Sequence, residues 1–375
     1  MSVETGALKE LTGLGQSVWL DYIRRGILDD GQLASLIEEK FVRGVTSNPA
    51  IFEKAITGST DYDSALASMR GRGVTPTEAY EKLAIEDIQQ AADLFLPLYE
   101  ASGGADGFVS LEVSPELAHD GPGSLAEARR FWSAVARPNV MIKIPGTDEG
   151  LDAVEHALAD GININITLLF SLDGYERVME RYLAALERRT ANGLPLDRIA
   201  SVASFFVSRV DSAVDAALDE KAAATSDQQE KERILALRGK AAIANAKLAY
   251  RSFQQVFGGD RFARLKSAGA RVQRPLWAST STKNPAYRDV LYVEELIGPD
   301  TVNTMPLQTM EAFADHGVAR RTVDIDIETS QAIFRDIEAL GIDLVEVTHA
   351  LQREGVEKFV LPFRDLLASI EGAIR

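Results

Sequence analysis

The sequence predicts an α/β chain that folds as an eight-stranded (β/α)8 TIM barrel with additional helices. Short runs rich in β-branched residues alternate with longer helical patterns, which is typical of βα units around a parallel sheet. Eight such runs occur along the chain, each followed by a helical segment. Eight repeats are the number that closes this kind of barrel. The alternative is an open doubly wound sheet, but no G-x-G-x-x-G turn follows the first strand, which disfavours its dinucleotide-binding version.

The strands and helices are placed by apolar periodicity and by capping residues. The predicted strands begin near Ser17, Arg43, Gly107, Val140, Ile162, Ser201, Val272 and Thr301. The main predicted helices cover about 30–40, 75–95, 124–136, 147–159, 172–190, 208–257, 326–340 and 344–374. A capping box of Thr75 and Glu78 opens the second helix, and Ser226 with Gln229 is predicted to open the second half of the long helical segment.

We expect one domain over residues 1–375, because barrels of this kind routinely exceed about 200–250 residues as a single unit. Within it, a helical insertion covers about 208–258 and C-terminal helices cover about 326–375. The apolar spacing of the last helix fits packing on the barrel or on a second copy of the chain. The sequence therefore allows a monomer or a homodimer.

Composition and charge exclude several classes of partner. The net charge of −16 makes the chain a poor ligand for polyanions, so neither nucleic acid nor an anionic membrane is expected as a partner. No apolar run reaches the roughly 18 residues of a membrane-spanning helix, and the N-terminal residues do not have the pattern of a signal peptide. The chain has no cysteine, hence no disulfide and no thiolate nucleophile. These features favour a cytoplasmic protein.

Lys143 is the most informative residue because it interrupts an apolar run, Val140-Met-Ile-Lys-Ile-Pro-Gly-Thr147. A buried ammonium is costly unless it is paired or neutralised. Desolvation favours the neutral amine, which is the form that attacks carbonyl groups. The run therefore predicts a Schiff-base lysine on a strand, and the alternative is a strand-end lysine that reaches solvent.

Strand alternation places further polar side chains on the same face as Lys143. Side chains alternate between the two faces of a strand, so the apolar face suits the covering helices and the polar face lines the barrel. Active sites of this architecture lie at the C-terminal ends of the strands. The polar face includes Ser110, Glu112, Asn165, Thr167 and Ser204.

These residue types suit carbon–carbon bond cleavage through an iminium, which also requires groups that move protons. Glu112 is a candidate, and Thr167 or an asparagine could orient a water between this acid and the amine. Asp21 closes the first strand and could accept a proton from a substrate hydroxyl. Arg209 starts the helix after the sixth strand, where backbone N–H groups and a guanidinium form an anion site. The pattern indicates a small phosphorylated carbonyl substrate.

A metal-dependent aldolase is the chemical alternative. The histidines are scattered, without H-x-H or H-E-x-x-H spacing, so zinc is not expected. No metal or organic cofactor is implied by the sequence.

Three motifs resemble the transaldolase family, in its long bacterial form within the class I Schiff-base aldolases. Residues 44–52, GVTSNPAIF, resemble the T-[ST]-N-P signature after the second strand. Residues 140–150 resemble the active-site lysine signature, and residues 161–171 resemble the strand that follows it. The region 274–306 is similar to the longer bacterial members.

The resemblance implies a role for each matching residue. Lys143 would form the Schiff base with the ketose donor, Glu112 and Thr167 would hold a catalytic water, and Asp21 would be the acid/base for cleavage. The implied substrate contacts are Asn48 and Asn165 for donor hydroxyls, Ser110 for the pocket wall, Ser204 and Arg209 for the phosphate, and Phe206 for the aromatic that separates transaldolases from fructose-6-phosphate aldolases.

The chain departs from the shorter family members at two places. The sixth strand reads Ser-Phe-Phe-Val-Ser-Arg over 204–209, where those members have proline and glycine at 205 and 208. Their seventh-strand phosphate arginine has no clear counterpart here. Lys283 is the predicted substitute, with Ser281 as the alternative.

The implied function is transfer of a dihydroxyacetone unit from sedoheptulose 7-phosphate to glyceraldehyde 3-phosphate in the non-oxidative pentose phosphate pathway, giving erythrose 4-phosphate and fructose 6-phosphate. One alternative is a fructose-6-phosphate aldolase that releases free dihydroxyacetone, and Glu112 and Phe206 argue against it. The other is a non-catalytic barrel that binds sugar phosphates.

Several of these residues also have an ordinary structural explanation. Asp21 could cap the turn after the first strand. Asn48, followed by Pro49, could be an ordinary turn residue after the second strand. Arg209 could pair with Asp211 or Asp215 on the surface of its own helix. Lys283 could be a surface loop residue.

Overall fold

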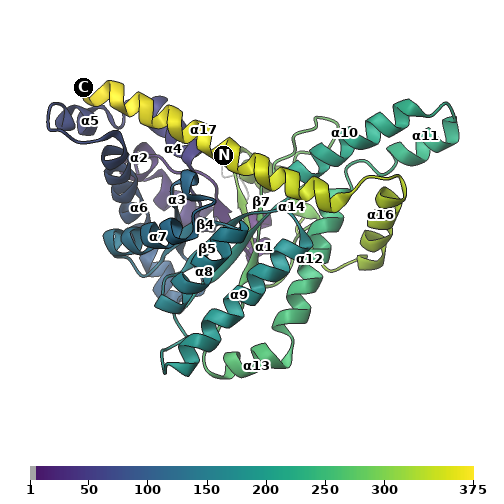
Figure 1. The fold of residues 1–375 in the computed structure, drawn as a ribbon, viewed down its shortest axis with the longest axis horizontal. Coiled ribbons are helices and arrows are strands. Elements are labelled where there is room, and N and C mark those ends of the chain that lie inside the picture. The colour runs from purple at the N-terminus through teal and green to yellow at the C-terminus, as the bar shows by residue number, and fades with distance from the viewer. Residues whose placement is uncertain (1–5) are drawn as a thin grey trace.

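The computed structural model describes residues 6–375, which form a closed barrel of eight parallel strands surrounded by helices (Figure 1). Each strand pairs with the next in sequence, and the last pairs with the first. This confirms the predicted (β/α)8 fold. The strands are β1 Gln16–Leu20, β2 Val42–Val45, β3 Phe108–Glu112, β4 Val140–Pro145, β5 Ile164–Leu169, β6 Ser201–Phe206, β7 Arg274–Ala278 and β8 Thr301–Met305.

Helices lie between the strands and at both ends of the barrel. Those of the first half of the chain are α1 Gly6–Gly13, α2 Arg25–Asp29, α3 Gln32–Glu39, α4 Pro49–Thr57, α5 Asp63–Met69, α6 Pro76–Ala101, the 3-10 turn η1 Pro115–Leu117, α7 Gly121–Val135 and α8 Asp148–Asp160. Those of the second half are α9 Leu172–Ala191, α10 Ser208–Ala224, α11 Gln228–Leu235, α12 Ala241–Phe257, α13 Asp260–Ser267, α14 Leu291–Glu294, α15 Leu307–His316, α16 Ile327–Ala339 and α17 Leu344–Ile374.

All eight strands begin within two residues of their predicted positions. The capping box before α6 is present, with Thr75 and Glu78 each accepting from the backbone of the other. The second predicted box is wrong, because Asp227 rather than Ser226 caps α11, accepting from the backbone N–H groups of residues 229 and 230. A carboxylate satisfies both of these donors, which gives Asp227 the advantage over the neighbouring serine.

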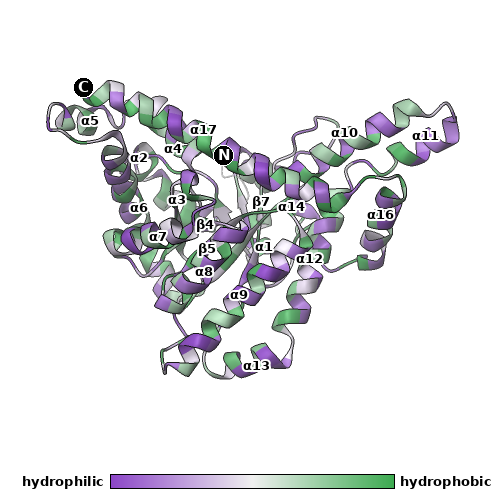
Figure 2. Cartoon of the chain, in the orientation of Figure 1, coloured by the Kyte–Doolittle hydropathy of each residue, from purple (hydrophilic) through white to green (hydrophobic). Residues whose placement is uncertain are grey.

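The outer helices are amphipathic, as helices with one face on a barrel should be. α8 and α9 each carry both hydrophilic and hydrophobic residues along their whole length (Figure 2). No helix within residues 6–375 is long and apolar enough to cross a bilayer. In Figure 1, α10 and α11 project from the barrel as an arm. The insertion predicted in two helical halves consists of three helices, α10, α11 and α12.

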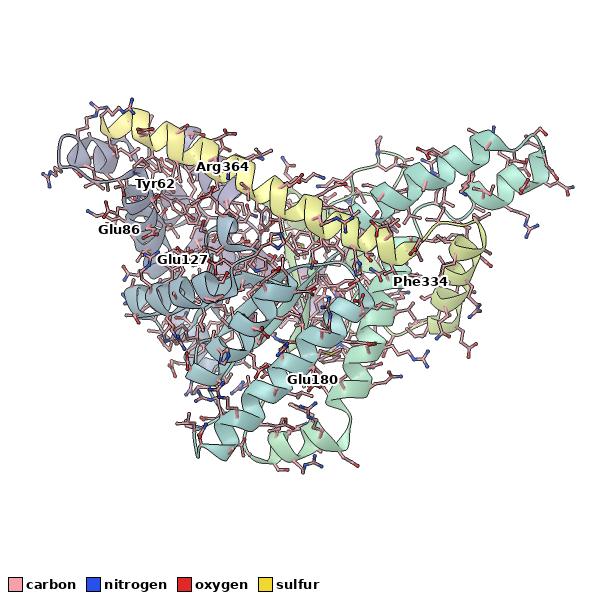
Figure 3. The ribbon with its side chains drawn as sticks, viewed as in Figure 1. Tyr62, Glu86, Glu127, Glu180, Phe334 and Arg364 are labelled. Atoms are coloured by element: carbon pink, nitrogen blue, oxygen red, sulfur yellow. The ribbon has the colours of Figure 1, made fainter. Side chains whose placement is uncertain are left out.

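The C-terminal helix α17 packs across its own barrel. It spans the molecule from the side of α16 to that of α5 (Figure 1) and contacts α4, α6 and α10 on the way. Gln352 donates to the carbonyl oxygens of Gly146 and Leu168, at 3.0 and 3.1 Å. Arg364, labelled in Figure 3, donates to Glu116 of η1 at 2.8 Å. These contacts support the single domain predicted for the chain, which stays a prediction, as does its oligomeric state.

Gly44 of β2 allows the strands β1, β2 and β3 to approach one another closely. A Cβ at this position would lie 2.6 Å from the Trp19 ring and 2.7 Å from the Phe108 carbonyl oxygen. Trp19 is fixed in turn, because its Nε1 donates to Asp106 at 3.0 Å. Neither the indole nor the backbone of β3 can give way without moving the sheet.

We expect Gly44→Ala to lower the free energy of unfolding by about 1–3 kcal/mol, the usual effect of overpacking a full core. Denaturant unfolding followed by circular dichroism measures it. Gly372→Ala is the matched control, because a Cβ there meets nothing within 4 Å and α17 gains a better helix former. Equal stabilities for the two variants would contradict the packing argument.

Candidate active site

The register of β3 and β4 places Glu112 directly beside Lys143. Lys143 Nζ lies 2.9 Å from Glu112 Oε2 and donates to the carbonyl oxygen of Ser47 at 3.0 Å. The two side chains are only 5% and 2% exposed. Both stand near the C-terminal ends of their strands, so the alternative of a solvent-reaching lysine is wrong.

The protonation of this pair can shift without creating net charge. Burial raises the pKa of Glu112, the adjacent Lys143 amine opposes that rise, and the negative charge of Asp21 adds to it. A proton that moves from Nζ to Oε2 leaves a neutral amine beside a carboxylic acid. This removes two buried charges together, which a low-dielectric site favours over leaving one of them unpaired.

Two buried oxygens next to the pair have no hydrogen-bond partner within residues 6–375. They are Glu112 Oε1 and Thr167 Oγ1. Thr167 lies at the end of β5, opposite Pro145 of β4. Buried polar atoms of this kind are normally satisfied by an ordered water or a ligand.

A hydrogen-bonded chain of side chains crosses β6, β5 and β3 beside the lysine. Ser204 Oγ donates to Asn165 Oδ1 at 2.7 Å, and Asn165 Nδ2 donates to Ser110 Oγ at 3.1 Å. All three are buried. The chain fixes which way the amide of Asn165 faces, because both of its polar atoms are assigned.

Asp21 faces the same space from β1. Thr46 Oγ1 donates to its Oδ1 at 2.6 Å, and the Thr304 hydroxyl lies 2.7 Å from that of Thr46. Burial raises the pKa of Asp21, while the Thr46 hydrogen bond and the nearby charge of Lys143 lower it. The ordinary explanation of Asp21 as a helix cap is wrong, because α2 begins after Arg24.

Asn48 begins a helix and also lines the cavity, while its contact with donor hydroxyls stays a prediction. Its Oδ1 caps α4 by accepting from Ile51 N at 2.9 Å, and the residue also lines the cavity above Lys143. The cap leaves Nδ2 as the amide group that can contact a ligand.

One cavity of about 410 Å³ joins these groups at the C-terminal end of the barrel. Ser110, Glu112 and Asn165 lie beneath its wall, bonded to one another or to the lining residues Lys143 and Ser204. The lining is Asp21, Tyr22, Thr46, Asn48, Ala50, Ile51, Lys54, Lys143, Thr167, Ser204, Phe206, Arg209, Ala278, Ser279, Ser281, Lys283, Thr304, Pro306 and Phe359.

Three cations meet at one side of this cavity. The Arg209 guanidinium lies over the Phe206 ring, 5.3 Å from its centroid, and its buried Nη1 has no hydrogen-bond partner in the described chain. Lys283 is exposed at the rim, where it donates to Ser281 at 2.8 Å. Burial lowers the pKa of Lys283, and the charges of Arg209 and Lys54 lower it further. Cations held together in this way favour an anionic ligand.

Arg209 does not pair with Asp211 or Asp215, so that ordinary explanation is also wrong. Both carboxylates accept hydrogen bonds from other groups: Asp211 from Ala242 N and Asp215 from Gly239 N.

Backbone strain accompanies the site. Leu168, after Thr167, and Ser279, after β7, have φ angles of 60° and 56°, in the left-handed region that non-glycine residues seldom adopt. Strain of this kind persists where the surrounding structure over-determines it, commonly at functional sites.

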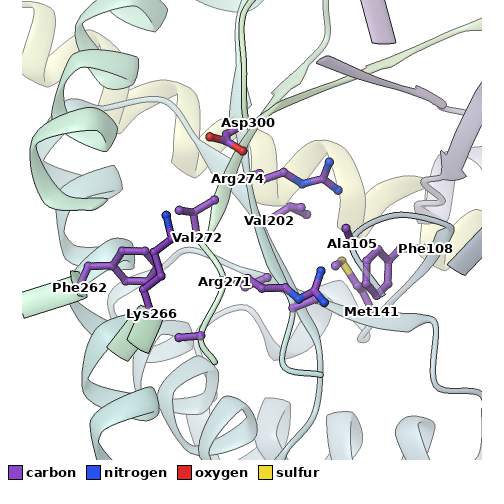
Figure 4. Close-up of a pocket in the computed structure, with 13 residues that line it drawn as sticks. Ala105, Phe108, Met141, Val202, Phe262, Lys266, Arg271, Val272, Arg274 and Asp300 are labelled. Atoms are coloured by element: carbon purple, nitrogen blue, oxygen red, sulfur yellow. The ribbon is translucent and has the colours of Figure 1, made fainter. Parts of the chain in front are cut away.

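A second cavity, of about 290 Å³, lies at the opposite, N-terminal end of the barrel (Figure 4). Its arginines are engaged within the chain. Arg271 donates to the carbonyl oxygens of Asp197 and Gly103, and Arg274 donates to Ser17. Because both of its arginines are already bonded, this cavity is the weaker candidate for an anionic substrate. Within residues 6–375, no cluster of His, Asp and Glu side chains has the arrangement of a metal site.

Comparison with known proteins agrees with the geometry. The family model described as "Transaldolase/Fructose-6-phosphate aldolase" matches residues 18–370. The chain belongs to this family. It is 46% identical over 373 residues to the transaldolase of Trichodesmium erythraeum, covering 99% of this chain and 98% of the relative. It is also 49% identical to transaldolase 1 of Streptomyces coelicolor (97% and 94% covered) and 47% identical to the transaldolase of Mycolicibacterium smegmatis (98% and 97% covered).

Sequence reasoning missed several lining residues, among them Phe359 and Lys54. Phe359 comes from α17, and Lys143 Nζ lies 5.6 Å from the centroid of its ring. Helical spacing alone marks Phe359 as apolar without saying which surface it covers. Lys54 lies on α4, directly after the Thr-Ser-Asn-Pro signature, so a helix predicted from that proline would have placed it near the cavity.

The buried pair predicts a pH dependence of stability in Lys143→Met. Loss of the amine removes the charge that holds the Glu112 pKa down, so its folded-state pKa rises further above the unfolded value. The folded protein then retains a proton that the unfolded chain releases, and stability falls as pH rises. We expect the variant to lose stability relative to the parent between roughly pH 5 and pH 8 in denaturant titrations.

The double variant Lys143→Met/Glu112→Gln is the control, because it removes the titrating group. It should lack this additional slope. If the stability of Lys143→Met followed that of the parent across this pH range, the Lys143 amine would not be what lowers the pKa of Glu112.

Proposed function

We propose that this chain is a transaldolase, which transfers a dihydroxyacetone unit between sugar phosphates through a Schiff base on Lys143. The observation that carries the proposal is the buried Lys143–Glu112 pair, with Nζ to Oε2 at 2.9 Å, opening onto a cavity with a cationic side. Family membership supports the same chemistry.

The first half-reaction forms and breaks bonds at the donor ketose. Neutral Nζ attacks the C2 carbonyl, and the carbinolamine loses water to give an iminium. Asp21 then takes the proton of the C4 hydroxyl. The C3–C4 bond breaks, its electron pair moves into the iminium to give an enamine on Lys143, and the shortened aldose leaves.

The second half-reaction reverses these steps with another aldose. The enamine carbon attacks the acceptor aldehyde, the new hydroxyl receives its proton from Asp21, and water releases the product ketose from Lys143. The two unpartnered oxygens, Glu112 Oε1 and Thr167 Oγ1, support a bound water that relays protons during dehydration and hydrolysis. Asn165, whose amide is oriented by Ser204, would bind a donor hydroxyl.

Arg209 and Lys283 would bind the substrate phosphate, and Lys54 would add to the positive field. A phosphate contact of Ser204 remains a prediction. Sedoheptulose 7-phosphate and fructose 6-phosphate as donors, with glyceraldehyde 3-phosphate and erythrose 4-phosphate as acceptors, are the proposed substrates. The pathway and the cytoplasmic location remain predictions.

An aldolase that releases free dihydroxyacetone is the nearest alternative. Phe206 closes one side of the cavity and contacts Phe170, with ring centroids 5.1 Å apart. A dry, closed site protects the enamine from protonation by water. Acceptor dependence distinguishes the two, since a transaldolase consumes fructose 6-phosphate only when an acceptor aldose is present.

Borohydride reduction in the presence of fructose 6-phosphate should attach a three-carbon adduct to Lys143. Reduction converts the iminium to a stable secondary amine, and peptide mass spectrometry locates it. Lys143→Met should carry no adduct. A three-carbon adduct on Lys54 or Lys283 instead would refute the assignment.

Thr46→Val should shift the acidic limb of the kcat/KM profile to higher pH. The Thr46 hydroxyl stabilises the ionised form of Asp21, so its loss raises the pKa of the base. A hydrogen bond to a carboxylate is worth about 1.5 kcal/mol or more, which corresponds to about one pH unit.

Thr304→Val is the matched control, because Thr304 contacts Thr46 but its hydroxyl is not bonded to Asp21. Its acidic limb should move much less. Equal shifts for the two variants would mean that Asp21 does not set this limb.

A further inference from the structure

A buried hydrogen-bonded network connects α10 with the loop that carries Lys283. Asp211 and Asp215 lie one turn apart on α10 and are 1% and 7% exposed. Neither belongs to an ion pair among the salt bridges of residues 6–375. Two buried carboxylates without a cation are held only if hydrogen bonds satisfy them.

Each carboxylate accepts one backbone and one tyrosine donor. Asp211 accepts from Ala242 N at 2.7 Å and from Tyr292 OH at 2.8 Å. Asp215 accepts from Gly239 N at 2.9 Å and from Tyr287 OH at 2.5 Å. Ala242 is in the first turn of α12, where a helix N-terminus stabilises negative charge, and Gly239 lies just before that helix.

Tyr287 belongs to the loop that follows β7, and Tyr292 to the short helix α14 at the end of that loop. The start of this loop is also attached to α10, because Ser208 N donates to Ser279 O at 3.1 Å and the two serine hydroxyls lie 3.0 Å apart. The loop is therefore fixed to α10 at Ser279, at Tyr287 and at Tyr292. Lys283 lies between the first two of these attachments.

α10 itself carries Arg209 in its first turn. The same helix thus holds one proposed phosphate cation directly and positions the other through the network. The two cations repel each other, and the charge of Arg209 contributes to the lowered pKa of Lys283. Without external support the flexible lysine would move away from the guanidinium.

We propose that Asp211, Asp215, Tyr287 and Tyr292 form a positioning clamp that fixes Lys283 against Arg209 for the phosphate group of the substrate. The inference rests on the proposed function, in which these two cations bind phosphate. It assigns a role to the 208–258 insertion, which supplies both carboxylates and both backbone donors. Preorganised cations lose less freedom on binding, so the clamp should appear as affinity for phosphate.

Tyr287→Phe tests the clamp, because it removes the hydroxyl group that donates to Asp215 and keeps the ring. The ring packs closely on Gly239, where an added Cβ would lie 2.8 Å from it. We expect KM for glyceraldehyde 3-phosphate and the Kd for inorganic phosphate to rise about tenfold, as loss of one hydrogen bond to a carboxylate allows. With fructose 6-phosphate held at saturation, turnover with unphosphorylated D-glyceraldehyde as acceptor and the amount of adduct at Lys143 should stay within about twofold. Tyr292→Phe is the second variant, in case the first does not fold.

Tyr62→Phe is the matched control. Tyr62 OH donates to the buried Asp87 at 2.7 Å, and Tyr62 lies on the side of the molecule opposite α10 (Figures 1 and 3). This variant should lose a similar stability without changing KM or phosphate binding. Two outcomes would overturn the clamp while leaving the proposed function intact. One is an equal rise in KM for phosphorylated and unphosphorylated acceptors in Tyr287→Phe. The other is an unchanged Kd for inorganic phosphate in both folded tyrosine variants. A parent protein with no turnover and no adduct would overturn the proposed function instead, and calorimetry with inorganic phosphate would still decide the clamp.

Discussion

The buried contact between Lys143 and Glu112 is the constraint on which the rest of the site depends. It exists because β3 and β4 pair in one register, and a slip by one residue would turn both side chains toward the helices. The Ser47 carbonyl fixes the amine from a third direction. A charged pair so deeply buried seldom adds stability compared with apolar residues of the same size. The proposed chemistry therefore accounts for this pair better than a contribution to folding does.

The low dielectric around this pair depends on a helix from the far end of the chain. α17 lies over the barrel mouth, and Phe359 covers the amine from above. Gln352 anchors the helix to two strand-end carbonyls, one of them at Leu168, whose strained backbone follows the catalytic candidate Thr167. The strained residue Leu168, the covering helix α17 and the Lys143 amine are thus connected by direct contacts. A movement of α17 would alter the exposure of Lys143 before it altered the barrel.

The periodicity of the sequence was sufficient to predict the barrel, because eight strands flanked by helices admit few topologies. Alternation was sufficient to bring Glu112 to Lys143. It could not reveal Phe359, since helical spacing marks an apolar face without naming the surface it meets. Nor could it place short helices such as α4 and α13, of nine and eight residues, where two turns give little periodic signal. Ser226 failed as a cap because an aspartate next to it competes for the same donors.

The proposed replacement of a strand arginine by Lys283 on a loop changes what the surrounding structure must supply. A strand-borne guanidinium is positioned by the sheet, and its planar fork matches a phosphate without further help. A lysine on a loop has a flexible stem and a point charge, so its position must come from the loop, and the loop must be held by something rigid. In the proposed clamp α10 holds this loop through Asp211 and Asp215, which accept from the backbone N–H groups of Ala242 in the first turn of α12 and of Gly239 just before it. If the clamp acts as proposed, the helical insertion and the change of cation are two parts of one structural solution.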